Sequence, residues 1–178
     1  MPDLRLSRRR CLLGLALGLN LGPSASLRAE PLPFRAYDVV LLQPGEVYEQ
    51  RTAGSEAVAA YLRSVGDEAQ RVLAEARPAM PNAGFIVVAV KPQRQARVWL
   101  DFERPLAADF VPLLSGRLRA LPALEVKNGP VVFALKVGLW GGAEPRRQAP
   151  APADWREAAR KAGHPLELGE LVDAVWAD

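Results

Sequence analysis

Asp101 and Glu103 are the residues whose type and spacing come closest to a catalytic pair. They are two positions apart in an alternating stretch, so on a strand both carboxylates lie on one face. Paired carboxylates can hydrolyse glycosidic bonds, one acting as acid and the other as base or nucleophile. Alternate polar residues also occur on any solvated sheet face, and we favour this second interpretation. We therefore assign no catalytic residue.

Other catalytic groups are scarce. His164 is the only histidine of the chain, and its neighbour Pro165 indicates a solvated or capping residue at a loop or helix start. A Ser-His-Asp triad would depend wholly on this residue. Ser55 and Ser64 fall in a predicted helix, and Ser115 lacks the strand-to-helix elbow of a hydrolase nucleophile. No metal site and no cofactor are predicted, because paired ligand spacings and phosphate-binding glycine loops are missing from the sequence.

A tryptophan flanked by charges is the strongest indication of a binding surface. Arg97, Trp99 and Asp101 alternate along a predicted strand and so share one face. Aromatic residues and arginine are enriched in protein interfaces. With Lys136 of the last predicted strand, these three residues are our candidate partner-binding residues. The same face could equally lie beneath the C-terminal helix, and the sequence leaves both possibilities open.

These residues must be positioned by a helix, a hairpin, a second helix and a last strand. Apolar residues at three- and four-residue steps predict a helix over 55–76, with Ser55 as N-cap and Pro78 after its end. Strands are expected at 84–91 and 96–103, joined by the loop 91–95. A helix follows at 107–120, in which Pro112 requires a late start.

The last strand is expected at 130–141, where every second residue from Val131 to Leu139 is apolar. A further short strand is expected at Val39–Leu42, stopped by the turn signal Pro44-Gly45. Together these elements predict the α+β class, a two-layer sandwich of one small antiparallel sheet with both helices on the Val98 face. This domain spans residues 30–142.

The C-terminal part is expected to be an appendage. Residues 143–153 are rich in proline and alanine and are typical of a linker. Residues 154–178 are expected to be helical, with Asp154 as a candidate cap. Such a short helix is not stable alone, so it packs on its own domain or on a partner.

Residues 1–29 are predicted to be a cleavable export signal. Arg8 to Arg10 precede an apolar run that is too short to span a membrane, and small residues follow it. Residues 7–13 resemble a twin-arginine signal, although an ordinary secretory signal also fits. Cys11, the only cysteine, precedes the apolar run, so lipidation is not expected. The predicted location is the periplasm.

The charge of the protein agrees with this division. Residues 1–29 hold five of the 23 basic residues and one of the 20 acidic residues, which leaves 18 basic and 19 acidic residues in the body. The body therefore has no excess of positive charge to attract nucleic acid, and no nucleic-acid partner is expected.

The order of the elements over residues 55–140 resembles the C-terminal domain of the TonB and TolA envelope proteins. Residues 57–81 are similar to the lead helix of that family and the prolines after it. Leu121-Pro122-Ala123, followed by Gly129-Pro130 and the strand to Val137, is similar to its last segment. The resemblance implies a periplasmic α+β domain. It does not extend to energy transduction, because a spanning helix with a long proline-rich rod is missing from the sequence.

Three functions are compatible with these patterns. The first, which we favour, is a non-catalytic periplasmic module that binds another envelope protein through a sheet edge or the Arg97/Trp99/Asp101 face. The second is an envelope hydrolase that uses Asp101 and Glu103. The third is a domain that binds a lipid or small ligand, with the apolar residues of 166–176 as a lid.

Overall fold

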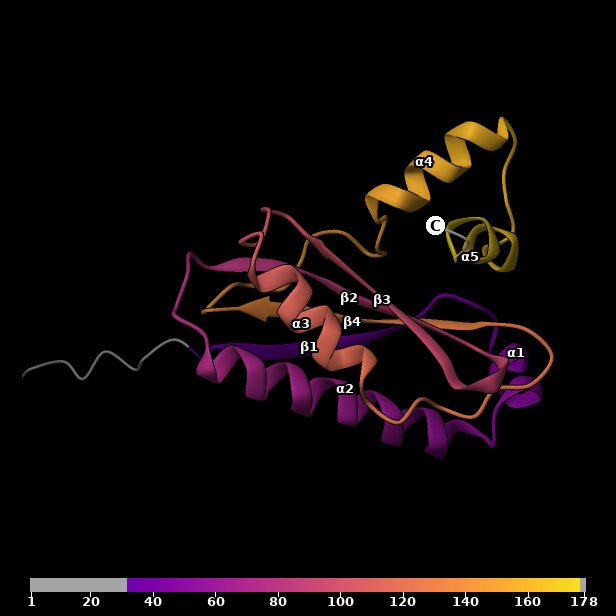
Figure 1. Ribbon diagram of the computed structural model, residues 1–178, viewed down its shortest axis with the longest axis horizontal. Helices are drawn as coiled ribbons and strands as arrows, with labels where there is room; N and C mark the ends of the chain where they lie inside the picture. The colour runs from indigo at the N-terminus through magenta and orange to yellow at the C-terminus, as the bar shows by residue number, and fades with distance from the viewer. Residues whose placement is uncertain (1–31, 177–178) are drawn as a thin grey trace, which may run out of the picture. The chain divides into compact units, whose positions relative to one another are not determined.

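An antiparallel sheet forms the centre of the computed structural model, which describes residues 32–176 (Figure 1). The predicted export signal lies outside the described residues. The sheet has four strands in the order β1-β4-β2-β3. Their bounds are Phe34–Leu41 for β1, Asn82–Lys91 for β2, Gln95–Phe102 for β3 and Val131–Leu139 for β4.

The two central strands, β2 and β4, are buried on both faces. Their register pairs Ile86 with Leu135 and Val88 with Phe133. Because side chains alternate along a strand, these residues face one side of the sheet and their neighbours face the other. The continuous apolar run of β2 follows from this position, since layers cover both of its faces.

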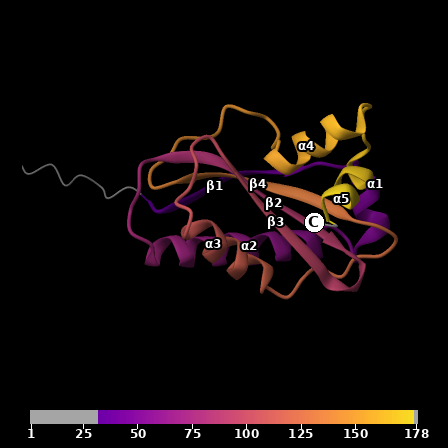
Figure 2. The same cartoon turned by 45° about the horizontal axis from the view of Figure 1, so that its top comes forward.

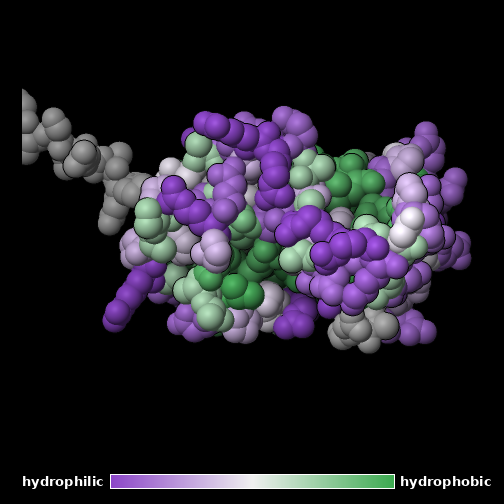
Figure 3. Space-filling model, turned by 90° about the horizontal axis from the view of Figure 1, so that it is seen from above, coloured by the Kyte–Doolittle hydropathy of each residue, from purple (hydrophilic) through white to green (hydrophobic). Residues whose placement is uncertain are grey.

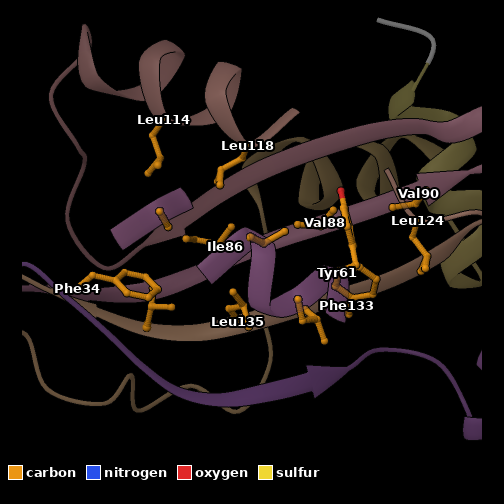
Figure 4. Close-up of a cluster of buried hydrophobic side chains, with 14 of the residues drawn as sticks. Phe34, Tyr61, Ile86, Val88, Val90, Leu114, Leu118, Leu124, Phe133 and Leu135 are labelled. Atoms are coloured by element: carbon orange, nitrogen blue, oxygen red, sulfur yellow. The ribbon is translucent and has the colours of Figure 1, made fainter. Parts of the chain in front are cut away.

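Helices α2 (Ser55–Glu75) and α3 (Phe110–Arg119) cover the first face, as predicted. In Figure 4, Leu114 and Leu118 of α3 and Tyr61 of α2 point toward the apolar residues of the strands. The Tyr61 and Phe133 rings meet edge to face at 5.9 Å. Each fully buried leucine or phenylalanine contributes about 1.5–3 kcal/mol to stability relative to an exposed one.

A buried carboxylate joins these two helices. Glu68 of α2 is 5% exposed, and its Oε1 accepts a hydrogen bond from Nε of Arg117 of α3 at 2.7 Å. Arg71, one turn further along α2, pairs with the other carboxylate oxygen. Both lone-pair sides of the carboxylate are therefore satisfied, as burial of a charge requires.

Helix α1 (Gly45–Arg51) is absent from the sequence-based prediction, in which Pro44-Gly45 indicates a turn only. Pro44 instead precedes the first helical residue, where a fixed φ is suitable. Two capping predictions were wrong. Gly54 rather than Ser55 is the N-cap of α2, and Pro152 rather than Asp154 is the N-cap of the C-terminal helix α4. In both cases the predicted cap lies just inside the helix.

Helices α4 (Ala153–Ala162) and α5 (Leu168–Trp176) pack on the opposite face of the sheet, so that the sheet lies between two helical layers (Figure 2). The segment before α4 has the composition of a linker but is packed: Pro145, Pro150 and Pro152 are buried. The chain reaches this face through Gly142, where a Cβ atom would lie 1.7 Å from the carbonyl oxygen of Asn82.

Candidate functional site

The predicted Arg97/Trp99/Asp101 face is covered by the C-terminal helices. Trp99 is 7% exposed, and its ring meets Trp155 of α4 at 5.3 Å in an edge-to-face arrangement. The Arg97 guanidinium lies 5.4 Å from the centre of the Trp99 ring and donates to the carbonyl of Val175 in α5. Of the two possibilities that the sequence left open, the structure has the second, in which the face lies beneath the C-terminal helix.

The two candidate carboxylates do not form a pair. Asp101 Oδ2 accepts hydrogen bonds from Arg147 Nη1 at 2.8 Å and from the backbone N–H of Ala151 at 2.7 Å. Glu103 is exposed and lies just beyond the end of β3. Asp101 therefore holds the segment that leads into α4, and its carboxylate is engaged by Arg147 and Ala151.

Lys136, the fourth candidate, has the same role. Its side chain is 6% exposed in the centre of the sheet, and Nζ contacts Glu144 Oε1 at 2.7 Å. The ion pair attaches the start of the C-terminal segment to β4. Figure 3 views the side on which α4 and α5 lie, where hydrophilic groups cover most of the surface and hydrophobic atoms show in hollows between them.

The remaining candidates for chemistry are separate from one another. His164 is exposed after α4, with Nδ1 3.0 Å from the carbonyl oxygen of Pro165. Ser64 and Ser115 bond to carbonyls of their own helices. Within residues 32–176, no cluster of three or more His, Cys, Asp or Glu side chains could hold a metal ion.

A groove beside β1 is the feature that the sequence did not reveal. It has a volume of about 780 Å³ and lies between the outer edge of β1 and helices α1 and α2. Its floor and walls are mainly apolar, with polar groups of α1 and α2 at the rim. The lining residues of β1 and β4 are Phe34, Ala36, Val39, Leu41 and Leu135; those of the helices include Tyr48, Val58, Ala59, Leu62, Arg63 and Asp67.

Tyr48 fixes the inner end of this groove. Its hydroxyl accepts hydrogen bonds from the backbone N–H groups of Leu42 at 3.0 Å and Gln43 at 3.3 Å, and donates to the carbonyl of Val132. Burial raises the pKa of Tyr48, while the two backbone donors act in the opposite direction. The hydroxyl thus joins α1 to the end of β1 and to β4.

The floor of the groove coincides with an open sheet edge. The N–H of Leu42 donates to the carbonyl of Val132, so alternation along an antiparallel ladder directs the backbone groups of Val39 and Leu41 away from β4. The N–H of Trp140 donates to the carbonyl of Pro33, so the backbone groups of Phe34 and Ala36 also point away from β4. Because of the register shift between Ala36 and Asp38, all four of these residues have their side chains on the groove side of the sheet.

The edge carries one protective contact. The outward N–H of Val39 donates to Oδ1 of Asp38 at 2.8 Å, which occupies a backbone donor that would otherwise be open. Bulges and charged residues are common devices against unwanted strand pairing. Val39 and Leu41 nevertheless remain 40% and 50% exposed. The edge is therefore partly protected while its apolar side stays accessible.

The fold and this site define an α+β domain with an open, apolar sheet edge. Comparison with known proteins adds no relative: no family model, no curated protein and no solved structure matches the chain. Among residues 32–176, no helix is both long and apolar enough to cross a membrane.

Proposed function

We propose that this protein is an exported periplasmic module that binds another protein segment by strand addition at β1. The apolar groove beside the outward backbone groups of β1 is the observation that carries this proposal. Main-chain hydrogen bonds provide affinity in this mode, and pockets for alternate side chains provide specificity. The predicted export signal and the resemblance to TonB and TolA domains support the envelope as its location.

The groove supplies both main-chain hydrogen-bonding groups and pockets for side chains on one side of β1. Phe34, Ala36, Val39 and Leu41 present outward N–H and C=O groups and also line the groove with their side chains. An added strand with apolar residues at every second position would therefore gain ladder hydrogen bonds and bury those residues against α2. The Arg97/Trp99/Asp101 face would be available only after α4 and α5 moved away.

The two alternative functions receive different support. A hydrolase that uses Asp101 and Glu103 is disfavoured, because Asp101 is engaged by Arg147 and Ala151. A small apolar ligand is a second candidate, because about 780 Å³ falls within the usual size of ligand pockets. Residues 166–176 would not be its lid, since Leu168, Leu171 and Val172 pack in the cluster around Trp99 on the opposite face.

A photo-reactive amino acid at position 39 tests the proposed function in cells that export the chain. We expect irradiation to give a discrete protein adduct, because an added strand lies about 5 Å from β1. The matched control is the same amino acid at Val111, which is also apolar and 38% exposed but lies on α3. The measurement is the mass of each adduct on a denaturing gel and by mass spectrometry.

A protein adduct from position 39 and none from position 111 supports strand addition at β1. Equal adducts from both positions, or none from position 39, contradicts it. If position 39 instead captures a lipid or another small molecule, the ligand-binding alternative is correct.

A further inference from the structure

We infer that the strand added at β1 is β1 of a second copy of this chain, paired antiparallel about a two-fold axis between Ala36 and Tyr37. The inference rests on the proposed function and names the partner of the same edge. A two-fold interface requires a surface that is complementary to itself. The sequence of β1 meets this requirement in its hydrogen-bonding pattern, its charges and its apolar residues.

The hydrogen-bonding pattern fits this register. An axis between positions 36 and 37 places Phe34 opposite Val39 of the second copy. Both residues direct their backbone groups outward, so they can exchange the N–H···O bonds of a hydrogen-bonded pair once the Val39 N–H leaves Oδ1 of Asp38. Pro33 falls opposite Val40 in a pair that makes no such bonds, so its missing N–H costs nothing there.

The charges fit the same register. Arg35 falls opposite Asp38 of the second copy, and symmetry repeats this contact on the other side of the axis. Phe34 and Val39 line the groove, so the adjacent Arg35 and Asp38 both lie on the opposite face of the sheet. Arg35 and Asp38 would form a non-hydrogen-bonded pair, in which side chains come closest. Both residues are exposed, and Arg35 lies over the Tyr37 ring at 4.9 Å.

Other registers lack this match. A parallel, in-register pairing would place each Arg35 beside the other Arg35 and each Asp38 beside the other Asp38, where like charges repel. An antiparallel pairing centred on Val40 would bring only Val39 and Leu41 together and would leave Phe34 without a partner. Of these three registers, only the axis between Ala36 and Tyr37 combines outward backbone groups at Phe34 and Val39 with opposite charges at Arg35 and Asp38.

The apolar residues complete the surface. Leu32, Val39 and Leu41 are 65%, 40% and 50% exposed, so half of the six exposed large hydrophobic side chains of residues 32–176 lie in or beside β1. In the inferred register Leu32 falls opposite Leu41 of the second copy, next to the groove wall formed by Gly45 and Tyr48. Each copy would thus contribute apolar side chains to the groove of the other.

A charge exchange tests the inference with little effect on the core, because both residues are exposed. Asp38→Arg also frees the Val39 N–H, which favours strand pairing, so a weaker dimer in this variant reports the repulsive charges. The exported, processed chain and the variants Arg35→Asp, Asp38→Arg and Arg35→Asp/Asp38→Arg are compared by sedimentation equilibrium. We expect the unchanged chain to dimerise. Each single variant should weaken the dimer about tenfold or more, since two symmetric contacts become repulsive, and the double variant should restore affinity to within about threefold. Far-ultraviolet circular dichroism confirms that all four chains are folded.

Three outcomes overturn the inference: a chain that stays monomeric up to roughly 1 mM, single variants that dimerise as well as the unchanged chain, or a double variant that fails to recover. The mass of the adduct at position 39 distinguishes a failure of the dimer inference from a failure of the proposed strand addition. An adduct with twice the mass of the chain supports both proposals. An adduct with a different protein alone retains strand addition and removes the second copy as its partner.

Discussion

Replacing Trp155 by alanine is expected to lower the free energy of unfolding by about 3–5 kcal/mol, the usual cost of truncating a buried tryptophan. Trp155 is 6% exposed and meets Trp99 edge to face at 5.3 Å. Its loss removes the main aromatic contact between α4 and the sheet. The same variant should make residues 143–176 more sensitive to protease, because few other large side chains hold α4 in place.

Trp176→Ala is the matched control for this prediction. Trp176 is only half-buried, and Lys91 lies over its ring at 4.5 Å. A cation–π contact is worth about 0.5–2 kcal/mol, and less apolar area is lost at this half-buried ring, so the control should cost less than Trp155→Ala. Urea unfolding and limited proteolysis measure both effects. Equal losses in the two variants would show that α4 is not anchored through the tryptophan pair.

Two buried tyrosines are expected to respond differently to removal of their hydroxyls. Tyr48→Phe should lower the free energy of unfolding by about 1–3 kcal/mol, because the N–H groups of Leu42 and Gln43 and the carbonyl of Val132 lose a partner. Tyr61→Phe should be neutral or stabilising, because its buried hydroxyl has no hydrogen-bond partner among the described residues. Urea unfolding at neutral pH measures both. A destabilised Tyr61→Phe chain would contradict the packing described around Phe133.

Tyr61 also predicts how stability changes in alkaline solution. Burial raises the pKa of Tyr61 to about 12 in the folded chain, above the ordinary value of 10.0. The unfolded chain loses this proton first as the pH rises. The contribution of neutral Tyr61 to the free energy of unfolding is therefore complete below about pH 10 and is lost as the pH rises toward about 12. The loss should be smaller in Tyr61→Phe. Unfolding curves that fall equally in both chains would contradict this assignment.

The sequence predicted the elements whose patterns are local. The apolar stripe from Val58 to Leu73 predicted α2, and alternation predicted β3 and β4. Pro112 correctly indicated a late start for the second helix, because proline is tolerated only in the first turn. These signals depend on residues within one element, so they do not require knowledge of the partners.

The candidate site depended on partners that are distant in the sequence. Val39 and Leu41 belong to a strand that the sequence predicted in part, but its position at the edge follows from pairing with Leu135 and Phe133. The outward direction of their backbone groups follows from the same pairing. Similarly, Trp99 has the composition of an interface, and only the position of Trp155 showed that its partner lies in the same chain.

Amide hydrogen exchange of Leu41 and Val40 tests most directly whether β1 is an open edge that receives a strand. Residue-resolved exchange is compared between the dilute, free chain and the purified adduct formed at position 39. We predict that the Leu41 N–H exchanges quickly in the free chain and slowly in the adduct, while the inward N–H of Val40 is slow in both. A Leu41 N–H that is slow in the free chain, or equally fast in both, would contradict the account.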